Sequence, residues 1–167
     1  MSEPFLGKNV VVGKNVRFGE DVVIWNFVVI GENTIIGDKT RVGSFCDIGK
    51  NVKIGNSCLV QTHVTISNGC RIGDNVFVAP NVSFLNDKFP VTEPLSPPII
   101  EDDVIIGGCA IVLPNVRIRK ESIVGAGSLV TKNVPAGVLV MGSPARQVMA
   151  REEYEIKREE YKRALSR

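Results

Sequence analysis

The chain has 167 residues, of which 44% are hydrophobic, and a formal net charge of +2. This length suits one domain with its own core, and the nearly balanced charge does not favour a nucleic-acid-binding protein. No segment approaches the roughly 18–20 apolar residues that a membrane helix needs, and the start, "MSEPFLGKNV", lacks the basic and apolar regions of a signal peptide. We therefore expect a cytoplasmic protein without membrane insertion.

Apolar residues recur at every sixth position through the first half of the chain. The positions are Leu6, Val12, Phe18, Ile24, Ile30, Ile36, Val42, Ile48, Ile54, Val60, Ile66, Ile72, Val78 and Phe84. The next residue is often glycine, as a tight corner with unusual backbone angles would require, and a second, smaller residue lies two places before each position. The same step of six resumes at Ile100 and continues to Val130.

Neither the period of a helix nor the alternation of a strand fits this repeat. A unit of six predicts a short strand followed by a turn, and three units close a triangular coil of 18 residues that stacks on the next coil. The twenty hexads predict between six and seven coils. We therefore predict an all-β solenoid over residues 1–142.

The six-residue period is the hexapeptide-repeat signature, and the chain is similar to the left-handed parallel β-helices that carry it. The left hand is implied by this resemblance alone, since crossovers between parallel strands are usually right-handed. The expected fold is thus a left-handed parallel β-helix with a protruding loop and a C-terminal α-helix.

The cysteines fit the same repeat. Cys46, Cys58 and Cys70 occupy the small inward position of their hexads, on three different faces, and Cys109 lies just before the equivalent position at Ala110. Without a secretion signal they are expected to be reduced thiols. We predict buried structural thiols rather than metal ligands or a nucleophile, and no metal site.

The rhythm breaks between Phe84 and Ile100, which are sixteen residues apart. The segment "LNDKFPVTEPLSPP" carries four of the nine prolines, and proline favours an extended loop. We predict a loop over residues 85–99 that projects from one corner. Asn86 and Asp87 have an ordinary interpretation as the Asx turn that begins it.

The C-terminal segment 143–167 has the pattern of a helix. Ser143 can cap it, Pro144 suits its first turn, and apolar residues from Val148 to Leu165 fall near one face. We expect this helix to pack on or beside the solenoid, where it could cover unpaired strand edges at the open end.

Residues 60–90 resemble the nucleotide-linked amino-sugar N-acyltransferases of the hexapeptide family. The matching elements are Gln61, His63, the segment "DNVFV" at 74–78, Phe84 and the segment "NDKFP" at 86–90. The chain departs from the family pattern at Asn68, at Ala79–Pro80 and at Val91, where the family usually has Glu, His or Gly, and Arg. The resemblance implies an acetyl-coenzyme A-dependent N-acetyltransferase that acts on a dTDP- or UDP-linked amino deoxysugar for surface glycans.

The same resemblance implies a set of catalytic and substrate-binding residues. Asn86 orients the amine, Asp87 holds the sugar or takes the proton, and Lys88 and Phe89 complete the substrate site, with Phe89 stacking on a sugar or base. His63 is the only histidine, and imidazole suits a general base. A purely structural role of His63 remains an alternative.

The segments "IGGCAIVLPNVRI" and "VGAGSLVTKNVPAGVLVMGSPAR" resemble the coenzyme A-binding end of the family. The resemblance implies that Gly107, Gly108, Gly125 and Ala126 leave backbone groups open to the pantetheine arm. Lys132 and Arg146 are the implied partners of the coenzyme phosphates. The alternatives are a corner that needs small residues and ordinary solvated charge.

Counting hexads places these residues on edges of the prism. The turns after Val60 and Phe84 lie at different corners, and if the loop adds no net side, the turns after Ile106 and Val124 return to the His63 corner. His63 and the coenzyme groove then share one edge, while Asn86 lies on another. We therefore predict a homotrimer with its sites between subunits.

Two other functions remain open on the same fold. An O-acetyltransferase acting on a sugar or on serine would have the same coenzyme half, and a non-catalytic scaffold would have the same repeat. A zinc enzyme of the carbonic anhydrase type would need three histidines, and this chain has one.

Overall fold

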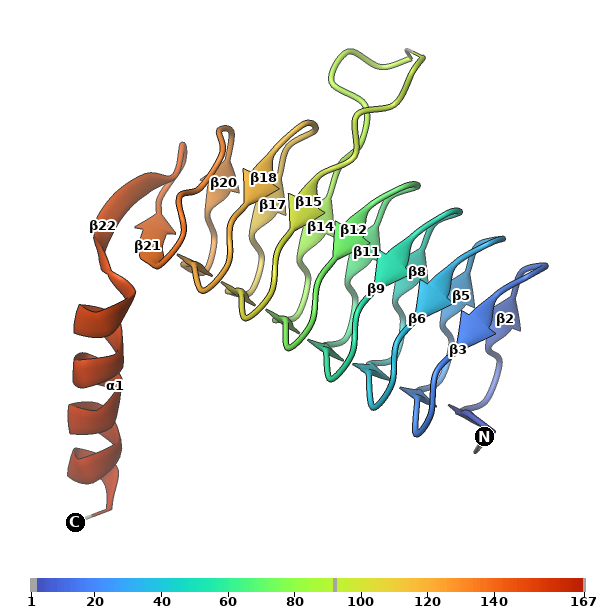
Figure 1. Ribbon diagram of the computed structural model, residues 1–167, viewed down its shortest axis with the longest axis horizontal. Helices are drawn as coiled ribbons and strands as arrows, with labels where there is room; N and C mark the ends of the chain where they lie inside the picture. Colours follow the sequence, from blue (N-terminus) through green and yellow to red (C-terminus); the bar gives the residue numbers. More distant parts are fainter. Residues whose placement is uncertain (1–2, 92, 167) are drawn as a thin grey trace.

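The computed structural model describes residues 3–91 and 93–166, which form a parallel β-solenoid followed by one helix (Figure 1). Residues 1–2, Thr92 of the predicted loop and Arg167 of the predicted helix lie outside the described residues. The predicted all-β solenoid with a C-terminal helix is confirmed.

Three parallel sheets form the faces of the prism. Sheet I contains β1 (Phe5–Leu6), β4 (Val23–Ile24), β7 (Arg41–Val42), β10 (Leu59–Val60), β13 (Phe77–Val78), β16 (Ile105–Ile106), β19 (Ile123–Val124), β21 (Val138–Met141) and β22 (Arg146–Ala150). Sheet II contains β2 (Val11–Val12), β5 (Val29–Ile30), β8 (Asp47–Ile48), β11 (Thr65–Ile66), β14 (Ser83–Phe84), β17 (Ile111–Val112) and β20 (Leu129–Val130). Sheet III contains β3 (Arg17–Phe18), β6 (Ile35–Ile36), β9 (Lys53–Ile54), β12 (Arg71–Ile72), β15 (Ile99–Ile100) and β18 (Arg117–Ile118).

The register follows the 18-residue coil. Val60, for example, is paired with Val42 before it and Val78 after it. In Figure 1 the chain advances from right to left, rises on the far side through β2 and returns on the near side through β3, which is a left-handed winding. The solenoid is longer than the six to seven coils predicted, because Val134 bridges Ile118 in place of a strand and β21 then continues sheet I.

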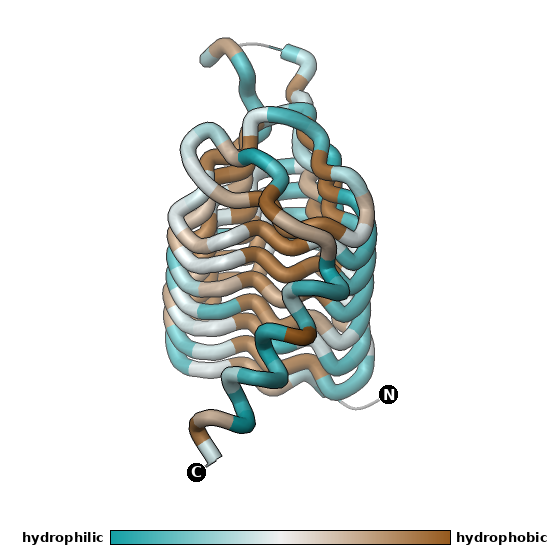
Figure 2. The backbone as a smooth tube through the Cα atoms, turned by 90° about the vertical axis from the view of Figure 1, so that its left-hand side faces the viewer, coloured by the Kyte–Doolittle hydropathy of each residue, from teal (hydrophilic) through white to brown (hydrophobic). Residues whose placement is uncertain are grey.

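The inward positions of successive coils stack into one continuous core. The apolar residue of each hexad from Ile24 to Val130 is buried, as is the smaller residue two places before it. Figure 2 shows the hydrophobic segments repeating in register from coil to coil. The predicted inward position of Cys46, Cys58 and Cys70 is confirmed, and burial raises the pKa of the Cys46 thiol to about 11 and that of Cys70 to about 12. These thiols are therefore protonated and poor nucleophiles at neutral pH.

Cys109 differs from the other three cysteines. The prediction that it is buried is wrong, because it is exposed at a corner and has a φ of 58°. The buried residue of that hexad is its neighbour Ala110.

The corners of the prism require the left-handed backbone region. Among the described residues, sixteen other than glycine have φ between 55° and 62°, and seven of them are asparagines, the residue type that tolerates this region best after glycine. The glycines that follow many of the apolar positions have another reason than the predicted one. A Cβ on Gly31, for example, would lie 2.5 Å from the backbone C of Gly49 in the next coil. These glycines are needed for close stacking of coils rather than for unusual backbone angles.

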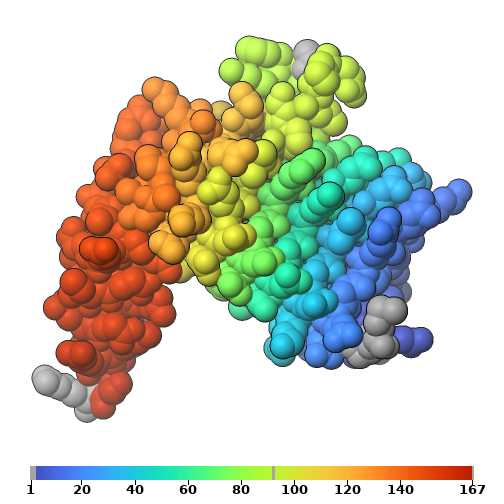
Figure 3. Space-filling model, in the orientation of Figure 1, coloured from blue at the N-terminus to red at the C-terminus, as the bar shows by residue number. Residues whose placement is uncertain are grey.

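The predicted loop projects from the corner between sheets II and III (Figures 1 and 3). It leaves after β14 and ends at Pro98, since Ile99 already belongs to β15. A hydrogen bond from the Ser96 N–H to the Asn86 carbonyl (2.7 Å) closes its base. Because β15 pairs with β12 and β18 in regular register, the insertion adds no net side to the prism.

The C-terminal helix begins later than predicted. Residues 146–150 form β22, which pairs antiparallel with β21, so Ser143 and Pro144 lie in a turn and do not cap a helix. The strand prevails because the outer edge of β21 would otherwise carry unpaired backbone groups. Helix α1 (Arg151–Leu165) has no side-chain N-cap and no buried residue, and extends away from the solenoid. Among the described residues, no helix has the length and apolar character needed to cross a membrane.

A threonine inside the core, Thr40, provides a test of this architecture. Thr40 is fully buried; its hydroxyl donates to the Gly55 carbonyl (2.8 Å) and accepts from the Cys58 N–H (3.0 Å). Thr40→Val keeps the shape but leaves the buried Cys58 N–H and the part-buried Gly55 carbonyl without this partner, so we expect a loss of about 1–3 kcal/mol in the free energy of unfolding. Urea denaturation measures it, with Thr65→Val on the exposed face as the control; equal stability of the two variants would contradict the assignment.

Candidate functional site

The predicted site residues lie on two different edges of the solenoid. The I–II edge, defined as the corners that join sheet I to sheet II, carries His63, Gly107, Gly108, Gly125 and Ala126. The II–III edge, defined in the same way, carries Asn86 and Lys132. The arrangement deduced from counting hexads is therefore confirmed, and one chain does not bring its two halves of the predicted site together.

His63 is exposed, and a hydroxyl group fixes the orientation of its ring. The Thr62 hydroxyl lies 2.8 Å from His63 Nδ1 and donates its hydrogen to the Ser44 carbonyl (2.7 Å). Because a hydroxyl has a single hydrogen, Thr62 can only accept from Nδ1. The neutral ring is then protonated on Nδ1, and Nε2 carries the lone pair, with no hydrogen-bond partner in residues 3–91 and 93–166.

Two aromatic residues stack beneath His63 along the same edge. The Phe45 ring lies 4.9 Å from the imidazole with an interplanar angle of 17°, and Phe27 stacks on Phe45 at 5.1 Å and 6°. Phe27, Phe45 and His63 are 18 residues apart and all have φ near 60°, a region that costs a bulky side chain roughly 1–2 kcal/mol. Sequence reasoning missed Thr62, Phe27 and Phe45, although a search at steps of 18 from His63 would have found the two phenylalanines.

Asn86 departs from the pattern of its edge. One coil earlier, the Asn68 side chain accepts a hydrogen bond from the Lys50 N–H (2.7 Å), whereas the Asn86 amide donates through Nδ2 to the Asn68 carbonyl (3.0 Å). Only Nδ2 can donate to a carbonyl, so Oδ1 is the acceptor that this hydrogen bond leaves unused. Asn86 lines a groove of about 240 Å³ together with Asp47 and Thr65. The amide is therefore oriented to accept a hydrogen bond from a ligand.

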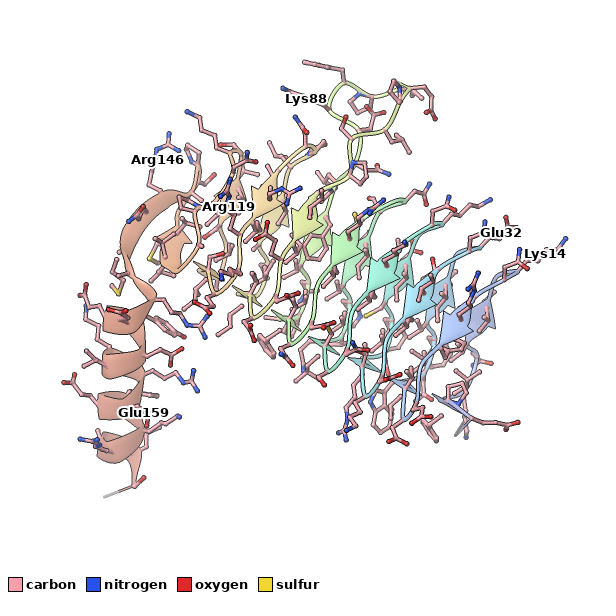
Figure 4. All side chains as sticks on the ribbon, in the orientation of Figure 1. Lys14, Glu32, Lys88, Arg119, Arg146 and Glu159 are labelled. Atoms are coloured by element: carbon pink, nitrogen blue, oxygen red, sulfur yellow. The ribbon has the colours of Figure 1, made fainter. Side chains whose placement is uncertain are left out.

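The rest of the loop places charged and aromatic groups at the surface. Asp87 Oδ1 accepts from the Phe89 N–H (3.1 Å), which is the Asx turn anticipated as the ordinary interpretation of this pair. Lys88 Nζ lies 5.7 Å from the centre of the Phe89 ring, and Phe89 is 70% exposed. Figure 4 shows Lys88 on the outer part of the loop. These side chains face solvent rather than the I–II edge of their own chain.

Small residues on the I–II edge leave backbone groups open. A Cβ on Gly107 would lie 2.4 Å from Ala126 N, so coil stacking alone explains this glycine, and Met141 explains Gly125 in the same way. Gly108 is different, because its nearest atom would be Pro80 O at 3.4 Å. The N–H groups of Gly108 and Ala126 and the carbonyl of Ala126 have no hydrogen-bond partner within the described part of the chain. They can bind the amides of an extended ligand.

The two predicted phosphate partners lie near the C-terminal end of the II–III edge. Lys132 and Arg146 line one groove of about 270 Å³ with Asn133 and Gln147. A second groove of about 340 Å³ joins Lys132 to Asp87 and Lys88 at the loop. The predicted coenzyme residues are thus divided between the edges, with the glycines on one and the cations on or beside the other. Within the described ranges, no group of three or more His, Cys, Asp or Glu side chains could hold a metal ion.

Each edge alone supplies part of the chemistry of acyl transfer. The I–II edge has an imidazole with a free lone pair and open amide groups, and the II–III edge has an oriented acceptor, an exposed loop and two cations. Transfer of an acyl group to an amine needs a bound acyl donor, an oriented nucleophile and an acceptor for its proton. Both edges are needed to provide all three.

Comparisons with known proteins agree with the repeat. The family model described as "Bacterial transferase hexapeptide (six repeats)" matches residues 33–68 and 51–86, and "Hexapeptide repeat of succinyl-transferase" matches residues 97–132. Together these segments span more than half of the chain.

One curated relative is the 2,3,4,5-tetrahydropyridine-2,6-dicarboxylate N-acetyltransferase of Staphylococcus aureus (strain Newman), 47% identical over 70 residues. The match covers 42% of this chain and only 29% of that relative, so the chain corresponds to less than a third of the relative's length.

Solved structures share the fold over most of the chain. AntD, an N-acyltransferase from Bacillus cereus determined with dTDP and coenzyme A, has a TM-score of 0.70 and 24% identity, covering 90% of this chain and 92% of its own. A hexapeptide-repeat acetyltransferase from Vibrio cholerae, complexed with acetyl coenzyme A, has a TM-score of 0.55 and 25% identity, covering 87% and 70%. The first of these likenesses concerns the fold alone.

The two neighbouring glycines on the I–II edge provide a matched test of the geometry. We expect Gly107→Ala to lower the midpoint of thermal unfolding, because its Cβ would meet the Ala126 backbone, whereas Gly108→Ala should unfold like the wild type. Circular dichroism melting curves of the two variants measure the difference. A larger loss of stability in Gly108→Ala than in Gly107→Ala would contradict this description of the edge.

Proposed function

Since the chain belongs to the hexapeptide-repeat acyltransferase family, we propose that it transfers an acetyl group from acetyl-coenzyme A to the amine of a nucleotide-linked amino deoxysugar. The family and the fold support acyl transfer, and the resemblance of residues 60–90 supports the amino sugar, carried on dTDP or UDP. The proposed product serves surface glycan synthesis, and a cytoplasmic location, where both substrates would be met, remains part of the proposal.

The observation that carries the proposal is the open backbone on the same edge as His63, two and three coils further along the solenoid. The Gly108 N–H, the Ala126 N–H and the Ala126 carbonyl lie on the same edge as His63, and a pantetheine arm has two amides that need such partners. These groups would hold the arm, and Lys132 and Arg146 would bind the phosphates. The coenzyme supplies the acyl thioester when it is bound.

The remaining residues act on the amine. Asn86 Oδ1 accepts a hydrogen bond from the amino group and directs its lone pair, while Asp87, Lys88 and Phe89 contact the sugar and its nucleotide. His63 Nε2 takes the proton that the amine loses as the new C–N bond forms, and returns it to the sulfur when the C–S bond breaks. The balance is an amide and a free thiol, without any other reactant.

The two edges meet only between subunits. We propose a homotrimer in which the I–II edge of one copy faces the II–III edge of the next, so that each of three sites takes His63 from one chain and Asn86 from another. The exposed Trp25 on the I–II edge and the exposed Val29 of sheet II support this arrangement, since large exposed apolar groups are typical of interaction surfaces.

Two alternatives differ in what the II–III edge does. An O-acetyltransferase would use the same open backbone on the I–II edge but bind a hydroxyl at Asn86, and a scaffold would bind no coenzyme. The unused acceptor Asn86 Oδ1 and the cations Lys132 and Arg146 support the enzyme over the scaffold.

Coenzyme A release from acetyl-coenzyme A tests the reaction directly. We expect turnover with one member of a panel of dTDP- and UDP-linked 3-amino and 4-amino sugars, and a fall of about 100-fold in kcat/KM for Asn86→Ala because the amine is no longer oriented. Lys157→Ala, on the exposed helix, is the control. Coenzyme binding without turnover on any amine would favour the O-acetyltransferase, and no coenzyme binding would favour the scaffold.

Complementation tests the site between subunits. His63→Ala and Asn86→Ala are each expected to be nearly inactive, but mixed trimers assembled from equal amounts should regain about a quarter of the wild-type sites, because one site in four combines two intact edges. The measurement is coenzyme A release after co-expression with two different tags. Activity that stays at the level of the single variants would mean that each chain holds a complete site.

A further inference from the structure

The stack of Phe27, Phe45 and His63 uses residues that its backbone disfavours. All three have φ between 58° and 61°, where asparagine stands at many other corners of the solenoid. Both phenylalanines are about half exposed, at 47% and 52%, so burial in their own chain does not explain them. A strained conformation that packing does not require points to a function.

What the stack contacts is the imidazole. Phe45 covers one face of the His63 ring at 4.9 Å and is itself supported by Phe27. The stack fixes the plane of the ring, and the hydrogen bond to Thr62 fixes its rotation within that plane. Together they leave one orientation to a side chain that would otherwise be mobile on an exposed corner.

Thr62 also determines which nitrogen carries the proton. Its hydroxyl donates to the Ser44 carbonyl, which already accepts from the His63 backbone N–H (3.0 Å). The hydroxyl is therefore held as an acceptor toward Nδ1 at 2.8 Å. In water the neutral imidazole of a free histidine favours the opposite tautomer, with the proton on Nε2 and the lone pair on Nδ1.

We propose that Thr62 and Phe45 are positioning residues that hold His63 as the Nδ1–H tautomer with Nε2 ready to accept the proton of the substrate amine. This inference rests on the proposed function, in which His63 is the base. The proton leaves the amine nitrogen as the C–N bond forms, resides on Nε2 while Nδ1–H stays bonded to Thr62, and passes to the departing sulfur. Thr62 touches neither substrate and acts only through His63.

The single histidine allows the tautomer to be observed without substrate. We expect nitrogen-15 NMR of histidine-labelled protein, at about pH 8.5 and thus above the ordinary titration range of an imidazole, to show Nε2 as the unprotonated nitrogen. Thr62→Val should shift the population toward the Nε2–H form, and Thr62→Ser, which keeps the hydroxyl, should restore the wild-type spectrum. A wild-type ring protonated on Nε2, or an unchanged tautomer in Thr62→Val, would overturn the proposal.

Kinetics with a matched pair of variants tests the stack. Phe45→Asn places a residue suited to the left-handed region at the strained corner, so we expect an unfolding temperature equal to or above that of the wild type but a kcat lower by roughly tenfold, with little change in KM. Lys39→Asn relieves the same kind of strain (φ of 58°) at a corner between sheets III and I, away from His63, and should retain most of the activity. A Phe45→Asn enzyme with full kcat would overturn the positioning role.

The two failures can be told apart. If His63→Ala keeps full activity while the NMR result is as expected, His63 is not the base and the proposed mechanism fails although the tautomer is held. If His63→Ala is inactive but Thr62→Val keeps both its tautomer and its kcat, the mechanism stands and the positioning role fails.

Discussion

Every part of this molecule depends on the stacking of one 18-residue coil on the next. Each strand of a regular coil pairs in register with the strands 18 positions before and after it, as Val60 does with Val42 and Val78, and the glycines that follow many of the apolar positions allow the coils to approach. The neighbours of a side chain in adjacent coils are therefore set by its position in the sequence, because they lie 18 residues before and after it. The prism has three faces and three edges, and any functional residue must lie on one of them.

The division of the candidate site follows from that constraint. A residue can be moved along an edge by steps of 18, but it cannot reach another edge without breaking the repeat. His63 and Gly108 therefore share an edge by register, while Asn86 stays on the next one. The proposed site between subunits rests on this constraint, because the solenoid keeps two edges of one prism apart.

Period and spacing were sufficient to predict the strands, the core and the distribution of residues over edges. Leu6, Phe84 and Ile100 fall in strands where the step of six places them, because stacking leaves little freedom. The features that the repeat did not predict depend on local alternatives, such as strand against helix, and on side-chain geometry at the corners. Residues 146–150 follow a helical pattern yet form β22, since an open sheet edge was available to them. The hydrogen bond between Thr62 and the His63 ring depends on side-chain geometry at a corner, and the six-residue repeat does not predict this geometry. Exposure of Cys109 depends on the same corner geometry.

In the insertion between β14 and β15, the length of the loop is independent of the register of the coils on either side of it. It starts and ends at one corner and its base is closed by the hydrogen bond from Ser96 to Asn86, while the coils on both sides keep their register. Because the entropy of closing a loop rises only slowly with its length, longer or shorter versions could be exchanged there at small cost in stability. A loop of another length can therefore replace this one without changing the register of the coils. Under the proposed function, such a replacement would change the contacts to the sugar and leave the proposed coenzyme-binding corners in place.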